Sequence, residues 1–340
     1  MNNSSSSISY EQFMDAFLDT LHYNKKTQQK IISEVASILH ANEATIYNKM
    51  QQRSKFTLEE ICRISRAKGI SLDQIIQKDN KENAMFSFYA DGLRYRPRTY
   101  KDYIDNILKH FQIITTFESP KGIFLANEVP LFHFLRFPNL IYFKLYIWNI
   151  TNWTIPNVSE YYDPSTIVND PEIQQSVKTL YHLFNTFHST EIWNPNMLDI
   201  TLAQLDYLCS SGRIKNTEHK KNLISELRKL TTYLENISND GYKLSLKDEK
   251  KSSIDVYLNE LLTNSEMILI DADGIRVLYD QFDSPNYISN MDPKLTHYVN
   301  VWMQKIIKKS THICGTGDKD KKVFFNRLNQ SIDALEMKIS

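Results

Sequence analysis

Side chains able to hydrogen-bond with base edges and phosphates gather in residues 34–53 of this chain of 340 residues. Ala36 is small where two helices must nearly touch, a four-residue turn follows Leu39, and Asn42 is a favourable N-cap. Ile46 lies ten residues after Ala36 and can pack beneath both helices. This spacing predicts a helix-turn-helix, which lays its second helix in the DNA major groove. The outward face of that helix carries or adjoins Thr45, Tyr47, Asn48 and Gln51.

Capping signals around the pair predict further helices. An N-cap Ser or Thr followed three residues later by Glu or Gln forms a capping box that satisfies the first backbone amides of a helix. Such pairs occur at Ser9 and Gln12, at Thr57 and Glu60, and at Ser71 and Gln74. Gly69 suits the end of a helix, because it accepts a left-handed backbone. Residues 9–77 therefore predict about five short helices.

This helix order, with the stretch ATIYNKMQQRSKFTLEEICRISRAKGISLDQI, resembles the lambda-repressor-like (Cro/C1-type, XRE) DNA-binding domains over residues 9–78. The resemblance implies that some residues of the second helix contact bases or phosphates. Two positions depart from the family pattern: His40 stands where the turn usually has Gly, and Ile32 replaces a Gln that commonly contacts phosphate. The implied contact residues are Glu43, Ala44, Thr45, Asn48 and Lys49.

Charge neither requires nor excludes nucleic acid, since the chain has 40 basic and 40 acidic residues. Residues 43–68 hold six basic and three acidic side chains, a local net charge of +3, and Arg53 and Lys55 are the basic residues nearest the second helix. Phosphate binding depends on local positive charge. So modest a charge predicts weak binding by one copy, and hence a homodimer on two half-sites about 34 Å apart. An ordinary helical hairpin with a solvated face is the alternative.

The amino-acid composition limits which classes of protein and which kinds of site this chain can form. Hydrophobic residues make up 41% of the chain, as in a folded protein, while only eight glycines and no Gly-rich phosphate loop occur. Three widely separated cysteines predict a reducing, cytoplasmic setting without disulfides or a CxxC zinc site. Polar interruptions in residues 131–150 argue against a membrane helix. We therefore expect no cofactor, no metal site and no membrane association.

Residues 266–280, EMILIDADGIRVLYD, are the main alternative centre of chemistry. An apolar strand ending in Asp-x-Asp-Gly resembles the first motif of haloacid-dehalogenase-like phosphotransferases. The resemblance implies a nucleophile at Asp271, an acid/base at Asp273 and a bound Mg²⁺. A β-hairpin is the simpler interpretation, because Asp273-Gly274 favours a type I′ turn between strands 266–270 and 275–279. We prefer the hairpin, because that motif normally opens a long α/β domain and only 66 residues follow Gly274.

Weaker patterns have ordinary structural explanations. His312 and Cys314 are close in sequence, but such a pair in an apolar stretch is more often core than catalytic. Arginines at 94, 96 and 98 interleave with tyrosines and can contact an anion or simply pack on aromatic rings. The tryptophans that can line an apolar ligand pocket, or belong to the core, are Trp148, Trp153 and Trp193.

The sequence thus predicts a multidomain chain: a tail at 1–8, an all-α helix-turn-helix domain at 9–78, a linker at 79–84 and an α+β domain at 85–340. The last part should contain a strand at 122–126 and helices beginning after Asp170 and Asp292, each an N-cap followed by Pro. We expect a bacterial-type cytoplasmic transcription regulator that binds an operator in double-stranded DNA and is not an enzyme. Its larger domain would sense a small-molecule or protein effector. The alternatives are a Mg²⁺-dependent phosphohydrolase with a helical targeting module and a protein-binding scaffold.

Overall fold

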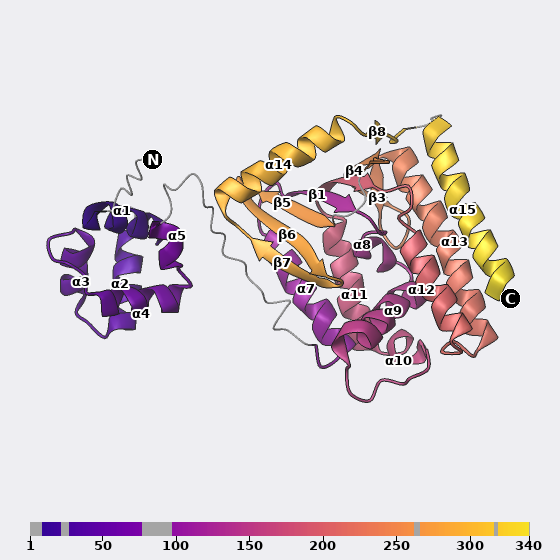
Figure 1. Ribbon diagram of the computed structural model, residues 1–340, viewed down its shortest axis with the longest axis horizontal. Coiled ribbons are helices and arrows are strands. Elements are labelled where there is room, and N and C mark those ends of the chain that lie inside the picture. Colours follow the sequence, from indigo (N-terminus) through magenta and orange to yellow (C-terminus); the bar gives the residue numbers. More distant parts are fainter. Residues whose placement is uncertain (1–8, 22–26, 77–96, 262–265, 316–318, 340) are drawn as a thin grey trace, which may run out of the picture. The chain divides into compact units, whose positions relative to one another are not determined.

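The computed structural model describes residues 9–21, 27–76, 97–261, 266–315 and 319–339 (Figure 1). The chain folds into two compact units, Met1–Ser87 and Phe88–Ser340. Helices and a mixed sheet occur together, so the chain has the mixed α+β character that the sequence indicates. The expected tail at 1–8 and the expected linker at 79–84 lie outside the described residues.

The described residues of the first unit form short helices whose ends follow the local capping signals. Both described capping boxes are present, at Ser9 with Gln12 and at Thr57 with Glu60. Gly69 ends its helix with φ of +66°, as predicted. The helices are α1 (Tyr10–Thr20), α2 (Gln28–Leu39), α3 (Glu43–Met50), α4 (Leu58–Lys68) and α5 (Leu72–Ile76). Their inward faces bury a single apolar core that includes Met14, Phe17, Val35, Ile46 and Ile64.

The second unit is built on a mixed eight-stranded sheet in the order β3-β4-β2-β1-β5-β6-β7, with β8 paired to β4. The pairs β1–β2 and β2–β4 are parallel, whereas β5, β6 and β7 form an antiparallel meander beside β1. The strands are β1 (Lys121–Ala126), β2 (His188–Trp193), β3 (Tyr242–Leu244), β4 (Lys250–Leu258), β5 (Met267–Ala272), β6 (Ile275–Asp283), β7 (Asn286–Asn290) and β8 (Thr311–His312).

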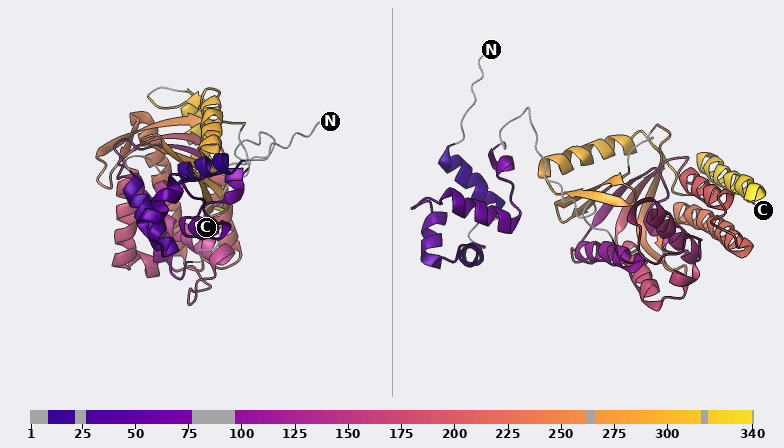
Figure 2. Two further views of the ribbon diagram at one scale, coloured as in Figure 1. Left: turned by 90° about the vertical axis from the view of Figure 1, so that its left-hand side faces the viewer. Right: turned by 60° about the horizontal axis from the view of Figure 1, so that its bottom comes forward.

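Helices cover the two faces of the sheet unequally (Figures 1 and 2). One face packs on a large core to which most helices contribute. The other face packs on α14 alone among the described helices, through Leu125, Ile192, Leu269 and Met303. The helices are α7 (Tyr100–Ile114), α8 (Leu131–Phe134), α9 (Pro138–Trp148), α10 (Ser165–Val168), α11 (Pro171–Phe184), α12 (Asp199–Ser210), α13 (Thr217–Asp240), α14 (Pro293–Ile307) and α15 (Lys319–Ile339), with a π-helical turn, η1, at Asn149–Trp153.

Several sequence predictions for this unit are confirmed. The predicted strand is β1, and Asp170 and Asp292 cap α11 and α14 with Pro in the first turn of each. Residues 131–150 lie in the core, mostly as α8 and α9. Within the described part of the chain, none of the helices combines the length and apolar character needed to cross a membrane.

The predicted hairpin is also present. Strands β5 and β6 pair from Met267 with Asp280 to Ala272 with Ile275. The turn residues Asp273 and Gly274 have φ of +53° and +87°, as a type I′ turn requires. The Asp-x-Asp-Gly sequence therefore closes a hairpin between antiparallel strands.

Candidate nucleic-acid interface

The turn between α2 and α3 has the backbone that the helix-turn-helix prediction requires. His40 is left-handed, with φ of +53° and ψ of +43°, and ends α2. The Ala41 N–H donates to the Ala36 carbonyl at 3.0 Å, which closes a Schellman-type end. The Asn42 side chain then accepts from the Ala44 N–H at 2.8 Å and starts α3. Three residues therefore connect α2 to α3, even though a non-glycine residue occupies the left-handed position.

Apolar contacts fix α3 against α2. Ile46 is fully buried and Met50 is 2% exposed, so one side of α3 faces the core of the unit. Ala36 is 6% exposed and belongs to the same core, which agrees with its expected role as the small residue between the helices. Because two buried side chains anchor a helix of eight residues, its other faces are presented in a fixed orientation.

The remaining faces of α3 are exposed and polar. Ala44, Thr45 and Asn48 are exposed, and Tyr47 is 36% exposed. Hydroxyl and amide groups form hydrogen bonds with base edges, and Asn pairs well with adenine. The structure thus brings together, on one accessible surface, the side chains that the sequence placed there. Gln51, directly after α3, is exposed as well.

Two basic side chains extend this surface beyond the end of α3. The Arg53 guanidinium lies 5.6 Å from the Tyr47 ring centre, and the Lys55 ammonium lies 4.9 Å from that of Tyr10. Both residues are exposed, so their charges stay hydrated while the rings hold the side chains in place. Cations held beside a helix suit contacts with phosphate oxygens.

Lys49 is placed differently from the other proposed contacts. Its Nζ lies 2.6 Å from Oε2 of Glu60, and the Lys49 side chain is only 13% exposed. Burial works against ionisation of Glu60, but hydrogen bonds from Lys49 and Thr57 hold the pKa of its carboxyl below the usual value. Since Glu60 also completes the capping box of α4, Lys49 joins α3 to α4 and does not present its charge at the surface.

Sequence reasoning missed two contacts that brace this surface. The Gln29 amide donates to Glu43 at 3.2 Å, which ties the start of α2 to the start of α3. The Arg63 guanidinium donates to the Ile38 carbonyl at 3.1 Å near the end of α2. The first contact joins residues 14 positions apart and the second joins residues 25 positions apart, so no local sequence pattern indicates either of them.

At the alternative centre, the β5–β6 turn, the carboxylates of Asp271 and Asp273 have protein partners in the hairpin and in the segment before β1. Asp271 lies 2.7 Å from Nε of Arg276 and also accepts from the Gly274 N–H at 3.1 Å. Asp273 accepts from the backbone N–H groups of Glu118 and Ser119. These contacts are typical of turn stabilisation, and they account for both residues without a metal ion.

The remaining candidates are dispersed. Trp148 and Trp153 pack with Tyr103, whereas Trp193 donates to Glu191 at 2.8 Å in another part of the core. The three tryptophans therefore do not line a shared pocket. Arg98 lies just before α7, while positions 94 and 96 lie outside the described residues.

Comparison with known protein families, with curated proteins and with solved structures found no match for this chain. The resemblance of residues 9–78 to lambda-repressor-like domains, and the function it implies, therefore stay predictions.

Proposed function

We propose that this protein is a transcription regulator that binds double-stranded DNA by laying α3 in the major groove. Residues 9–78 would act as a separate all-α, lambda-repressor-like domain. Thr45 and Asn48 read base edges, with Glu43, Ala44, Tyr47 and Gln51 beside them. Arg53 and Lys55 hold phosphates, while Lys49 supports the helix from behind.

The observation that carries this proposal is the left-handed turn at His40 between two buried anchors. Ala36 precedes the turn and Ile46 follows it, and between them they set the angle at which α3 leaves α2. An ordinary helical hairpin would also have a solvated polar face, so the support for DNA binding comes from which polar groups that face carries. Here that face carries hydrogen-bonding groups at helical spacing, as direct readout requires.

The modest charge favours a dimer. Within residues 43–68 the ion pairs Lys49–Glu60 and Lys68–Glu34 occupy two of the six basic side chains. Few cations remain to neutralise phosphates, so one unit binds weakly. A homodimer on half-sites about 34 Å apart doubles the number of contacts and supplies the missing affinity.

The larger unit is the proposed sensor. A surface depression of about 370 Å³ is lined by Arg136, Arg228 and Lys229 together with Asp248, Phe137 and Tyr233. Its volume is in the range of small-molecule sites. Arg136 pairs with Asp248, and Arg228 pairs with carboxylates of α15, so the depression is a candidate effector site without a preference for anions. An effector that binds the dimer better in one arrangement of its DNA-binding units shifts the operator affinity.

DNA selection tests the proposal. The full chain is incubated with a random duplex library, and the affinity for the selected sequence is measured at several salt concentrations. Asn48→Ala should weaken binding to that sequence by about 1–3 kcal/mol, roughly 5- to 150-fold, and relax the preference at one base. Arg53→Ala should weaken binding to all sequences and reduce the salt dependence by about one phosphate contact.

Two further variants serve as controls. Arg66→Ala removes an exposed arginine in the last turn of α4, outside the named contacts, and should weaken binding less than Arg53→Ala does. Lys49→Ala should lower the stability of the unit without changing which base is preferred. Failure to select any sequence at low salt would make α2 and α3 a structural hairpin and overturn the proposal.

A further inference from the structure

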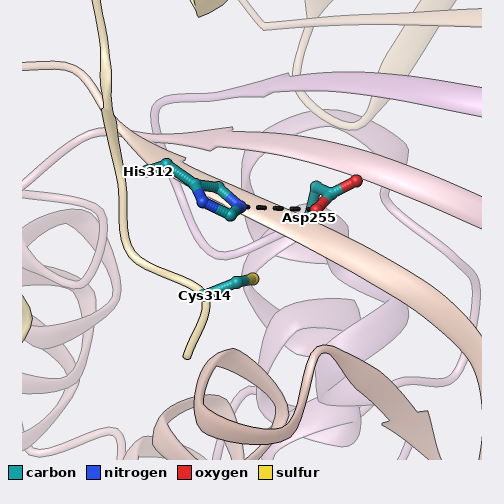
Figure 3. Close-up of side chains that lie close together, drawn as sticks. All are labelled: Asp255, His312 and Cys314. Atoms are coloured by element: carbon teal, nitrogen blue, oxygen red, sulfur yellow. Dashed lines mark hydrogen bonds and ion pairs between the residues drawn. The ribbon is translucent and has the colours of Figure 1, made fainter. Parts of the chain in front are cut away.

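Metal-ligating side chains on and beside β4 and β8 converge outside both the proposed DNA surface and the candidate effector depression. Asp255 lies on β4, His312 lies on β8, and Cys314 follows two residues later (Figure 3). One ligand atom from each of these residues lies within 4.8 Å of the other two. Imidazole, carboxylate and thiolate are the ligands that zinc prefers.

The pairing of β8 with β4 brings these side chains together. β8 pairs antiparallel with β4, so His312 lies opposite Tyr257, two residues after Asp255. Between the ligands, Ile313 is fully buried in the main core, while His312 is exposed and Cys314 is partly buried at the edge of that core. The residues 311–314 therefore hold an imidazole and a thiol beside the Asp255 carboxylate.

A second histidine, His188 on β2, lies beside Asp255 but outside this cluster of three. Thr190 pairs with Asp255, so His188 lies two residues along β2 on the same face. Its Nε2 is 3.7 Å from Oδ2 of Asp255, while Nε2 of His312 is 3.3 Å from Oδ1. Two imidazole nitrogens thus approach the same carboxylate from two strands.

The distance between Asp255 and His312 fits two ligands of one tetrahedral metal ion better than it fits a strong ion pair. With ligand bonds of about 2.0–2.3 Å, a tetrahedral zinc holds its ligand atoms about 3.3–3.8 Å apart. Charge-assisted N–H···O bonds are shorter, about 2.7–2.9 Å. The separation of 3.3 Å between Nε2 of His312 and Oδ1 of Asp255 falls in the first range, whereas His188 approaches the other oxygen of the carboxylate.

Surrounding contacts orient the donors. Nδ1 of His188 lies 2.8 Å from the Ser253 hydroxyl, and its Nε2 lies 3.3 Å from the Thr190 hydroxyl as well as 3.7 Å from Asp255. Sγ of Cys314 accepts from the Val256 N–H at 3.1 Å and donates to the Ile254 carbonyl at 3.5 Å, so both contacts hold the sulfur beside β4. Outer contacts of this kind fix the ligands of metal sites.

We propose that Asp255, His312 and Cys314 form a binding site for a divalent zinc-class metal ion. With three protein ligands the site leaves one coordination position for water. It fastens β8, and with it the connection between α14 and α15, to β4. On binding, the Cys314 thiol releases its proton to solvent and the sulfur coordinates as thiolate. The site is independent of the proposed DNA binding.

Cobalt(II) is the probe, because it replaces zinc and reports its ligands by absorption. The chelator-treated full chain should bind one equivalent of Co²⁺, with the intense visible bands of a tetrahedral ion and a near-ultraviolet thiolate band. Zn²⁺ should displace it stoichiometrically and raise the unfolding temperature. Cys314→Ser should remove the thiolate band, and His312→Ala should weaken binding by about 100-fold or more.

The other cysteines provide matched controls. Cys62→Ser and Cys209→Ser should keep the complete spectrum, because neither residue lies in the site. His188→Ala should also keep the thiolate band, because this imidazole lies beside Asp255 but outside the cluster of three ligands. Loss of the thiolate band in Cys62→Ser would overturn the proposal, because the sulfur ligand would then be a different cysteine. Absence of saturable cobalt binding by the wild-type chain would also overturn it, since the cluster would then contain only surface ion pairs. Circular dichroism of each variant separates lost binding from lost folding.

Discussion

Around α3 the polar side chains face solvent, whereas the second unit encloses charged groups in its core. Thr45 and Asn48 are exposed, but Glu191, His133 and Lys243 have no exposed surface. Glu191 accepts from His133 at 2.9 Å and from Trp193 at 2.8 Å. The ammonium of Lys243 donates to the backbone carbonyls of Phe184 and Phe187.

This difference shows how the same residue types serve two purposes. A polar group that will meet DNA must remain hydrated until its partner arrives, so it contributes little to folding. A buried charge has already left water and is tolerated only if the protein supplies partners. Removing a side chain should therefore change affinity in the first region and stability in the second.

The largest effect is expected at Glu191. Glu191→Ala leaves His133, Trp193 and Lys243 without their shared carboxylate, and breaking such buried sets costs about 3–5 kcal/mol. Urea unfolding followed by tryptophan fluorescence measures the loss, because all four tryptophans belong to the second unit. The exposed Glu260→Ala is the matched control. Equal stability of the two variants would remove the contrast between the regions.

A smaller effect is expected from pH at Lys243. Burial lowers the pKa of this ammonium to about 7, although Glu191 works in the opposite direction. Between pH 7 and the unfolded value near 10.4, the unfolded chain binds more protons, so stability rises with pH at up to about 1.4 kcal/mol per pH unit. Below pH 7 both states are protonated and this contribution is constant.

Lys243→Met provides the reference for that measurement. From pH 7 to pH 9 the wild-type chain should gain about 2–3 kcal/mol of unfolding free energy relative to the variant. Urea titrations at several pH values measure the difference, and other titrating groups cancel between the two proteins. A constant difference would mean that Lys243 stays charged in the folded protein.

Local signals explain what the sequence could predict. N-caps such as Asn42, Thr57 and Asp170 act within three residues, so the helix starts are readable without the fold. The Asp273-Gly274 turn likewise fixes its own hairpin. The cap and the turn that position α3 also depend on residues that are close in sequence. The exposed residues of α3 could therefore be predicted from the sequence.

Contacts between distant residues could not be predicted. The parallel pairing of Gly122 with Ser189 joins strands separated by several helices, and no spacing rule signals it. The donors Asp255, His312 and Cys314 meet only through the pairing of β8 with β4, so no local sequence pattern predicts this metal site. At Lys49 the residue type favoured a DNA contact, but its side chain turns to Glu60 across the fold.

The smallest effect is expected at the turn that positions α3. His40 is exposed and left-handed, a conformation that costs a non-glycine residue about 1–2 kcal/mol. His40→Gly removes this strain but makes the unfolded chain more flexible, so we expect a net gain of about 0.5 kcal/mol. Hydrogen exchange of the α2 and α3 amides measures this change in stability, and His40→Val should be destabilising.

DNA affinity should stay unchanged in His40→Gly, since no contact of α3 is altered. Loss of stability in His40→Gly would show that the turn is not left-handed in solution, and the geometric support for DNA binding would fail with it.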